Sequence, residues 1–380
     1  MEQKEGKQAN NLKSEHRPEN RQPGEGIGLP ELVWDIGTAY DFFISLSVLH
    51  NPEGFGLRAS WAAGVRSRLS AEHRKTLLEA ERLGGTPLHW VYYLPAPKSA
   101  DTVLYELNKI PAAERLPSLM ISDEETPPAI KHIYLESAAS GTWNEEQVAA
   151  LREEMRKYSW KKHKIPNTKV LGGMLQTWAN AEDFGERYLA ALEAYQRNFF
   201  SEEEKRIAPI LQEQLDKAKD LSIKAALPDL MEQLSHGLHF ETYMDREQII
   251  LAPSYWGAPL VFFQPVSDTK MIFTFGARPA DTSLVPGELV PDALLLGLKA
   301  ISDPTRLRIL RFLSCNPMTP AELARKLRLR APTVTHHLRT LRLAGLVHLS
   351  LDINTEGHYA ARLEAIDELN SILKKFLECD

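Results

Sequence analysis

The sequence predicts a mainly α-helical fold of the α+β class. It consists of a large helical N-terminal domain with a small antiparallel sheet, followed by a smaller C-terminal domain of helices and one hairpin. Apolar residues recur at helical spacing through most of the chain. Short aromatic and β-branched runs replace that spacing between residues 239 and 276. After Pro291 the helical spacing returns, and one strand–turn–strand pattern interrupts it.

Length and composition fit a globular protein and exclude a wholly disordered or fibrous one. The chain has 380 residues, 43% hydrophobic and 25% charged, and this length favours two or three domains. We expect a disordered tail over residues 1–28, a helical effector or interaction domain over residues 29–285, and a further domain over residues 290–380. Two cysteines cannot build a disulfide framework, which fits a cytoplasmic protein.

The N-terminal helices are predicted from caps and apolar faces. Asn144 with Gln147 forms one capping box, and Ser201 with Glu204 forms another. The aromatic run 88–94 is either a strand or a buried helical turn, because periodicity does not separate the two in so short a segment. Helices are expected at residues 31–50, 59–69, 71–83, 145–158 and 181–199, and from 201 onward.

The antiparallel sheet is predicted from short apolar runs with turn residues between them. A hairpin loop is expected at residues 267–269. Residues 248–267 carry no charge, as a membrane span would, but three prolines interrupt the stretch. We therefore expect no contact with a membrane. The strands are predicted at residues 239–243, 249–251, 260–266 and 270–276, and residues 278–291 are predicted to form a linker.

The C-terminal elements follow the order of a winged helix-turn-helix domain. Asp303-Pro304 and Thr319-Pro320 each place proline directly after a capping residue, which is typical of a helix start. Gly345 closes the helix over residues 332–344. Strands at 346–351 and 358–363 and a final helix follow. In such an arrangement the second helix of the helix-turn-helix pair is sized to enter the major groove of DNA.

The charge distribution supports a nucleic-acid ligand. The net charge of the whole chain, −6, would by itself argue against one. Between Arg306 and Arg342, however, there are nine basic residues and one acidic residue, so this segment carries +8 and the rest of the chain −14. A basic segment suits DNA phosphates. The acidic remainder repels them, which restricts DNA contact to the basic segment.

Helical geometry divides the helix over residues 332–344 into two faces. Val334, Leu338 and Leu341 share the core face, and His337 at its edge is expected to be structural. Threonine and arginine side chains on the opposite face can bond base edges or phosphates. With the preceding turn and the second strand of the hairpin, the residues expected to contact DNA are Arg328, Arg330, Thr333, Thr335, His336, Arg339, Thr340, Arg342 and His358.

Three segments resemble the ArsR-type (arsenic-repressor-type) winged-helix regulators. They are LKAISDPTRLRIL at 298–310, AELA at 321–324 and PTVTHHL at 332–338. The resemblance covers roughly ninety residues. It implies a homodimer that binds an imperfect inverted repeat of double-stranded DNA, usually as a repressor that a signal releases. Arg330 stands where the family commonly has a serine that caps the recognition helix, which weakens the cap.

The resemblance bears on metals and on dimerisation. The helix over residues 321–327 has no cysteine and the final helix has no histidine, so the family's metal sites do not carry over. His236 and His239 have the spacing of two ligands on a helix, which is a weak signal, and no metal is expected. The first and last helices of the domain are expected to form the dimer contact through Leu294, Leu298, Leu369, Leu373 and Phe376.

The N-terminal domain leaves three classes of function open. A small-molecule or other non-metal signal could bind an aromatic pocket of Trp61, Trp90, Tyr255 and Trp256, although tryptophans more often pack in the core. No common catalytic or dinucleotide motif occurs, so neither an enzyme nor a cofactor is expected. The alternatives to a sensor are a protein-interaction module and an unrecognised enzyme tethered to DNA.

Overall fold

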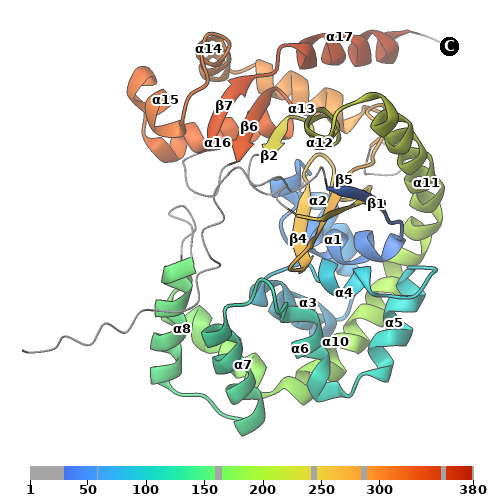
Figure 1. Ribbon diagram of the computed structural model, residues 1–380, viewed down its shortest axis with the longest axis vertical. Helices are drawn as coiled ribbons and strands as arrows, with labels where there is room; N and C mark the ends of the chain where they lie inside the picture. Colours follow the sequence, from blue (N-terminus) through green and yellow to red (C-terminus); the bar gives the residue numbers. More distant parts are fainter. Residues whose placement is uncertain are drawn as a thin grey trace, which may run out of the picture.

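The computed structural model describes residues 30–378 except 58, 159–164, 241–245, 284–288 and 352–356. Figure 1 shows three regions: the C-terminal elements at the top, the N-terminal helices at the bottom, and a sheet between them. The expected mainly α-helical, α+β class is confirmed. The tail expected over residues 1–28 lies outside the described residues. None of the helices in the described ranges is both long and apolar enough to span a membrane.

Short helices, most of them packed around α1 and α10, make up most of the N-terminal part. The chain enters it through the strand β1 (Glu31–Trp34). The elements that follow are α1 (Thr38–His50), the 3-10 helix η1 (Pro52–Phe55), α2 (Ala59–Ser67), α3 (Ala71–Leu83), α4 (Leu88–Tyr92), α5 (Ala100–Lys109), α6 (Ala112–Met120), α7 (Pro128–Ser140), α8 (Glu145–Tyr158), α9 (Thr168–Ala179), α10 (Ala181–Tyr195), the π-helical turn η2 (Gln196–Phe200), α11 (Ser201–Lys224) and α12 (Leu227–Leu234).

Short sequence patterns predicted some of these helices correctly and others only in part. The Asn144–Gln147 capping box is present, with reciprocal bonds of 2.8 and 3.0 Å, and α8 has the predicted bounds. The aromatic run 88–94, for which a strand and a helix were both open, forms the short helix α4. The helix expected over residues 31–50 is wrong in its first part, because residues 31–34 pair with a distant strand and form β1.

The predicted capping box at Ser201 is also absent from the described structure. The helix runs without a break from α10 through η2 into α11, so Ser201 lies inside a continuous helical segment. Glu204 instead accepts hydrogen bonds from the backbone N–H of Ala100 at 2.8 Å and from Thr38 Oγ1. The carboxylate thus satisfies a helix start in α5 and joins α11 to α1 and α5.

The sheet of the N-terminal part is mixed rather than antiparallel, which corrects the prediction. It contains β1, β3 (Gln248–Ser254), β4 (Phe262–Ser267) and β5 (Lys270–Gly276) in the order β1-β3-β5-β4. The β4–β5 hairpin is antiparallel as expected, but β3 pairs in parallel with both β1 and β5. The chain passes from β3 to the edge strand β4 and then returns to the centre, an insertion that sequence order does not reveal.

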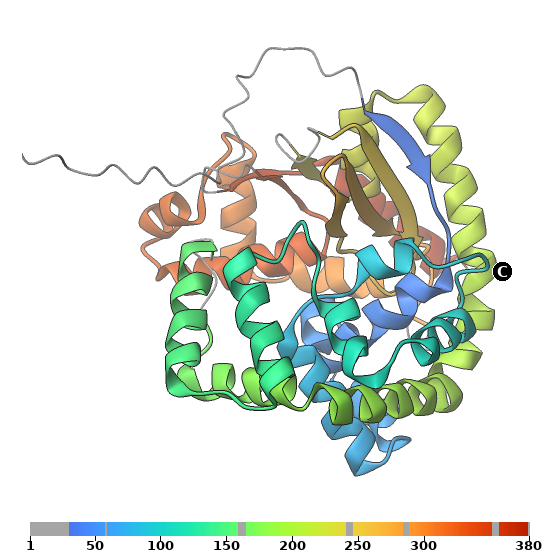
Figure 2. The ribbon, with the colours of Figure 1, turned by 60° about the horizontal axis from the view of Figure 1, so that its bottom comes forward.

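Helices cover both faces of this sheet, as Figure 2 shows. Ile250 and Ile272 face the large core that contains the buried side of α1. Ile249, Leu251 and Phe273 face the opposite way, into a second core with residues of α11 and α12. This alternation is the period of a β-strand, and burial on both sides explains the nearly continuous apolar sequence of β3.

The C-terminal part has its own core and the predicted element order. Val334, Leu338 and Leu341 lie in that core together with Leu323 and Ile309. The first and last helices pack against each other closely enough that a Cβ atom on Gly297 would lie 2.4 Å from Leu369 Cδ1. The elements are α13 (Asp292–Ile301), α14 (Pro304–Leu313), α15 (Pro320–Leu327), α16 (Ala331–Leu343), β6 (Val347–Leu351), β7 (His358–Ala361) and α17 (Glu364–Leu377).

A strand from the N-terminal part completes the sheet of the C-terminal part. The strand β2 (Leu238–Phe240) pairs in parallel with β6, with Leu238 opposite Leu349, and gives the order β2-β6-β7 (Figure 1). The backbone N–H of Leu349 also bonds to the carbonyl of Gly237 at 2.9 Å. The prediction placed residues 239–243 in the sheet of the N-terminal part, and for β2 this is wrong because its partner is β6. Residues 241–245 lie outside the described residues.

Candidate nucleic-acid interface

Two local signals fix the start and the end of the first helix of the helix-turn-helix pair, and the second helix begins without a side-chain cap. The Thr319–Glu322 capping box starts α15, where Thr319 N donates to Glu322 Oε2 at 2.8 Å and Glu322 N donates to Thr319 Oγ1. Arg328 ends the helix in the left-handed conformation, with φ of 56° and ψ of 42°. No side chain among the described residues caps α16 at Arg330, in agreement with the weak cap predicted there.

The outer face of α16 is open to solvent. Its inner face is the apolar core face described above, and His337 at the edge is half-buried, with burial lowering its pKa. Thr335 Oγ1 and Thr340 Oγ1 donate to backbone carbonyls within the helix. Of the residues predicted to contact DNA, those with exposed side chains are Arg328, Arg330, Thr333, Thr335, His336, Arg339 and His358, and Thr340 is half-exposed.

Arg342 is not part of that face, which corrects its assignment to DNA. Its side chain is buried, with 8% of its surface exposed. The guanidinium donates to the carbonyls of Ser235 and His236, both at 2.8 Å. Burial lowers its pKa to about 10, so it stays charged at neutral pH. Arg342 therefore joins α16 to the turn before β2. Because both of its terminal nitrogens donate to carbonyls there, it cannot offer a pair of donors to a phosphate.

The guanidinium of Arg306 also forms its hydrogen bonds within the protein. Its Nε donates to the carbonyl of Ala300 at 2.7 Å and its Nη2 to that of Lys299 at 2.6 Å, so it satisfies the end of α13. The remaining basic residues of the segment with charge +8 have exposed side chains. They are Arg308, Arg311, Arg325, Lys326, Arg328, Arg330 and Arg339.

The N-terminal part touches the outer face of α16 at one point that the sequence did not indicate. A Cβ atom on Gly54 would lie 2.7 Å from Arg339 Nη2 and 2.4 Å from Asn51 Nδ2. The Arg339 side chain therefore reaches η1 while it remains exposed. A larger residue at position 54 would displace the ends of the Arg339 and Asn51 side chains.

The residues predicted to form the dimer contact divide into two groups. Leu294 and Leu369 are buried within the chain, at 1% and 7% exposed, because α13 and α17 pack against each other. Their assignment to a dimer surface is corrected to the core of one chain. Leu298 and Phe376 are 38% and 40% exposed, and Leu373 is half-buried.

The predicted aromatic pocket does not form as one site. Tyr255 and Trp256 are fully buried, and Trp256 packs against Trp61 with 5.0 Å between ring centroids. This is core packing, the alternative that the sequence left open. Trp90 lies elsewhere, in edge contact with Phe43.

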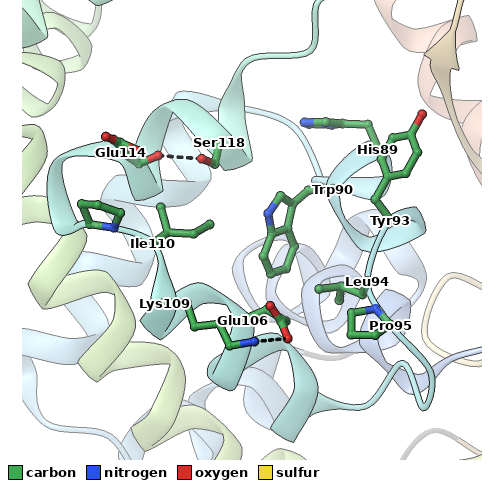
Figure 3. Close-up of a pocket in the computed structure, with 11 residues that line it drawn as sticks. His89, Trp90, Tyr93, Leu94, Pro95, Glu106, Lys109, Ile110, Glu114 and Ser118 are labelled. Carbon is green, nitrogen blue, oxygen red and sulfur yellow. Dashed lines mark hydrogen bonds and ion pairs between the residues drawn. The ribbon is translucent and has the colours of Figure 1, made fainter.

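Trp90 instead lines a cavity of about 480 Å³ between α4, α5 and α6. Figure 3 shows its indole between His89 and Tyr93 on one side and Ile110 and Ser118 on the other. His89 Nε2 is buried without a hydrogen-bond partner among the described residues, and Gln264 Oε1 lies 3.2 Å from its Nδ1. The lining also contains Glu106, Lys109 and Glu114. The cavity thus combines aromatic surface with charged groups.

Comparisons with known proteins agree with this geometry. Residues 301–350 match the model of a helix-turn-helix domain. An uncharacterised HTH-type transcriptional regulator of Methanocaldococcus jannaschii is 38% identical over 92 residues, which are 23% of this chain and 94% of that protein.

Two named repressors are similar over shorter lengths. The transcriptional repressor SdpR of Bacillus subtilis is 41% identical over 49 residues, 13% of this chain and 54% of SdpR. The arsenical resistance operon repressor of Staphylococcus xylosus is 41% identical over 44 residues, 12% of this chain and 42% of that repressor. This chain thus covers about half the length of these two repressors.

Proposed function

Because this chain belongs to the HTH-type transcriptional regulators and resembles their ArsR type, we propose that it acts as a homodimeric repressor at an imperfect inverted repeat in double-stranded DNA. Its N-terminal part senses a non-metal signal that releases the repressor. The outer face of α16 carries the proposal. That face presents Thr335, His336 and Arg339 to solvent, and the inner face is held in an apolar core.

The chemistry of this face suits the major groove. Arginine can bond the O6 and N7 atoms of guanine with two parallel donors, and threonine can bond base edges or pack on a thymine methyl group. Arg328 and Arg330 lie in the turn just before α16, where cations meet phosphates at the edge of the groove. His358 on β7 is exposed on the wing hairpin, a further position for contact with the DNA backbone.

The experiment is a gel-shift titration of the full chain on the DNA upstream of its own gene, repeated at several salt concentrations. We expect a specific complex whose affinity falls steeply with salt, because cation–phosphate contacts release counterions. Arg339→Ala should weaken specific binding by about 1–3 kcal/mol and relax the preference at one base position. Arg82→Ala, which removes an exposed arginine from the distant helix α3, should leave binding unchanged.

Two results would contradict the proposal. One is the lack of any specific, salt-sensitive complex with that DNA. The other is an equal effect of Arg339→Ala and Arg82→Ala. If Arg339→Ala lowers affinity by the same factor on all sequences, Arg339 is a phosphate contact and other residues of α16 read the bases.

The sensing role rests on the cavity beside Trp90. Its aromatic wall and its ion pair between Lys109 and Glu106 offer both packing and polar contacts to a small molecule. The contact of η1 with Arg339 supports a route from the N-terminal part to the DNA-binding face.

Thermal-shift screening of metabolites tests the sensing role. A ligand present at about 100 times its dissociation constant should stabilise the full chain by about 2.7 kcal/mol. Trp90→Ala should remove that stabilisation, and the fluorescence of the wild-type chain should change on binding. If a protein partner co-purifies with the chain and no metabolite stabilises it, the N-terminal part is an interaction module instead.

A further inference from the structure

Three possible metal ligands from separate segments meet where the N-terminal part joins the sheet of β2, β6 and β7, here called the wing sheet. They are Glu232 on α12, His239 on β2 and His348 on β6, and their ligand atoms all lie within 4.8 Å of one another. Glu232 Oε1 is 2.8 Å from His348 Nδ1, and Glu232 Oε2 is 3.4 Å from His239 Nδ1. The parallel pairing of β2 with β6 brings the two histidines together, with ring centroids 5.3 Å apart.

The contact between Glu232 and His348 is not a hydrogen bond. His348 Nδ1 is buried and has no hydrogen-bond partner among the described residues, although the carboxylate oxygen is only 2.8 Å away. Atoms that ligate one metal ion point their lone pairs at a common centre and not at each other. In a tetrahedral zinc site with bonds of about 2.0–2.2 Å, neighbouring ligand atoms are about 3.3 Å apart. The 2.8 Å and 3.4 Å separations are each close to this value, and they involve different oxygens of the Glu232 carboxylate, one facing each histidine.

The surroundings of His348 also resemble those of a metal ligand. Its other ring nitrogen, Nε2, lies 3.4 Å from Glu364 Oε1 at the start of α17. Metal-bound histidines usually donate their second ring N–H to a carboxylate, which fixes the orientation of the ring. Arg362 is close to the cluster, but its guanidinium is paired with Glu364 at 3.2 Å and with Glu368 at 2.6 Å. These two carboxylates offset its charge.

We propose that Glu232, His239 and His348 bind one divalent transition-metal ion of the Zn²⁺ class. One carboxylate and two imidazoles are a ligand set that Zn²⁺ accepts, with water in the fourth position. The ion connects α12 and β2 to β6, and it is separate from the sensed signal. His236 is not among the residues whose ligand atoms converge, and its Nε2 would lie 3.3 Å from a Cβ atom on Gly276.

The test is titration of metal-free full-length protein with Co²⁺ and Zn²⁺ in the absence of DNA. We expect one equivalent of Co²⁺ to produce the visible absorption of a histidine-containing site, and Zn²⁺ to displace it and raise the melting temperature. Glu232→Gln and His239→Gln should each weaken binding more than 10-fold. Glu364→Gln should weaken it about 10–100-fold through the orientation of His348. His132→Gln, on the exposed side of α7, is the matched control and should bind as the wild type does.

Circular dichroism shows whether each variant is folded. Glu232→Gln and His239→Gln both replace partly exposed side chains with ones of similar size. The proposal is overturned if the folded wild-type chain binds no Co²⁺ or Zn²⁺. It is equally overturned if Glu232→Gln and His239→Gln bind the metal as tightly as His132→Gln does. In either case the cluster is a glutamate–histidine ion pair only. Neither result depends on DNA binding, so the proposed repressor function is tested separately.

Discussion

Arg339 and Arg342 lie one helical turn apart in α16, and their surroundings assign them different tasks. Arg339 is exposed on the outer face that we propose to contact DNA, and its side chain reaches η1. Arg342 is buried, and its guanidinium bonds to two backbone carbonyls from the turn before β2. The first residue should therefore determine affinity for DNA, and the second should determine the stability of the junction between the two parts of the chain.

We predict that Arg342→Ala lowers the free energy of unfolding by about 2–4 kcal/mol. Two charge-assisted hydrogen bonds are lost, and the carbonyls of Ser235 and His236 remain in a buried region without their donor. Urea unfolding followed by circular dichroism measures the loss. Arg339→Ala is the matched control and should change stability by less than about 0.5 kcal/mol. Equal stability of the two variants would show that the bonds of Arg342 contribute little.

Asp41 predicts a pH dependence of stability. It is fully buried in α1 and accepts hydrogen bonds from Ser254 Oγ at 2.6 Å and from the backbone N–H groups of Tyr255 and Trp256 at 2.9 and 2.8 Å. Desolvation outweighs these bonds and raises the pKa of Asp41 from 3.8 to about 6. The folded protein thus keeps this proton at pH values where the unfolded chain has released it.

The contribution of Asp41 to stability should fall as pH rises from about 4 to 6. Over that window the folded state binds more protons than the unfolded state, so stability decreases with pH. Because Asp41 is fully buried, the loss should be about 3 kcal/mol. Denaturant unfolding of the wild type and of Asp41→Asn at several pH values measures it, since the difference between the two slopes isolates this one group. Parallel slopes would mean that the carboxyl titrates as it does in water.

At the scale of elements, α6 and α10 pack closely at Gly185. A Cβ atom at this position would lie 2.0 Å from the carbonyl oxygen of Ala112. Backbone atoms cannot rotate away, so the helices themselves would have to separate. Arg115 on α6 strengthens the contact by donating to the carbonyl of Gly185 at 3.2 Å.

Gly185→Ala should therefore destabilise the protein by about 1–3 kcal/mol, although alanine is the better helix former. Gly173 in α9 provides the comparison, because a Cβ atom there would meet no described atom within 4 Å. Gly173→Ala should stabilise by up to about 1 kcal/mol. Melting temperatures of the two variants should shift in opposite directions, and a shift of the same sign would contradict the packing argument.

Elements fixed by local signals could be predicted from the sequence, and those fixed by distant partners could not. Helix α8 follows from the Asn144–Gln147 capping box, and the helix-turn-helix follows from its caps and its apolar spacing. The position of the strand β2 is determined by its pairing with β6, more than a hundred residues later in the chain. The three residues of β2 contain no sequence pattern that would predict this partner. The prediction that Arg342 contacts DNA was wrong for the same reason. Helical spacing predicts which residues share a face of α16, but it does not predict which other segment packs on that face.

At the scale of the molecule, the sequence predicts a domain boundary between residues 285 and 290, but contacts between packed elements cross this boundary. The strand β2 completes the wing sheet, Arg342 bonds to the turn before it, and Lys375 of α17 pairs with Asp281 at 2.6 Å. A change in the N-terminal part can therefore reach the DNA-binding part through packed elements and not only through a linker. The candidate metal cluster lies at the same junction.

The proposed homodimer gives the last prediction. After α13 and α17 have packed against each other, Leu298 and Phe376 remain 38% and 40% exposed on these two helices. Burying the part of each side chain that is still exposed contributes about 1 kcal/mol, the glutamates would in addition have to be desolvated, and each substitution occurs twice in a symmetric dimer. The double variant Leu298→Glu/Phe376→Glu should raise the dimer dissociation constant more than 10-fold in sedimentation experiments.

Ile223→Glu is the matched control. Ile223 on α11 is 82% exposed, so its replacement adds one glutamate, against two in the double variant, at a surface with no proposed role in the dimer. The variants should also differ on DNA, since a monomer engages one half of an inverted repeat and loses the gain from the linked second half. A double variant that remains dimeric, or a control that dissociates equally, would place the contact between protomers on another surface of the molecule.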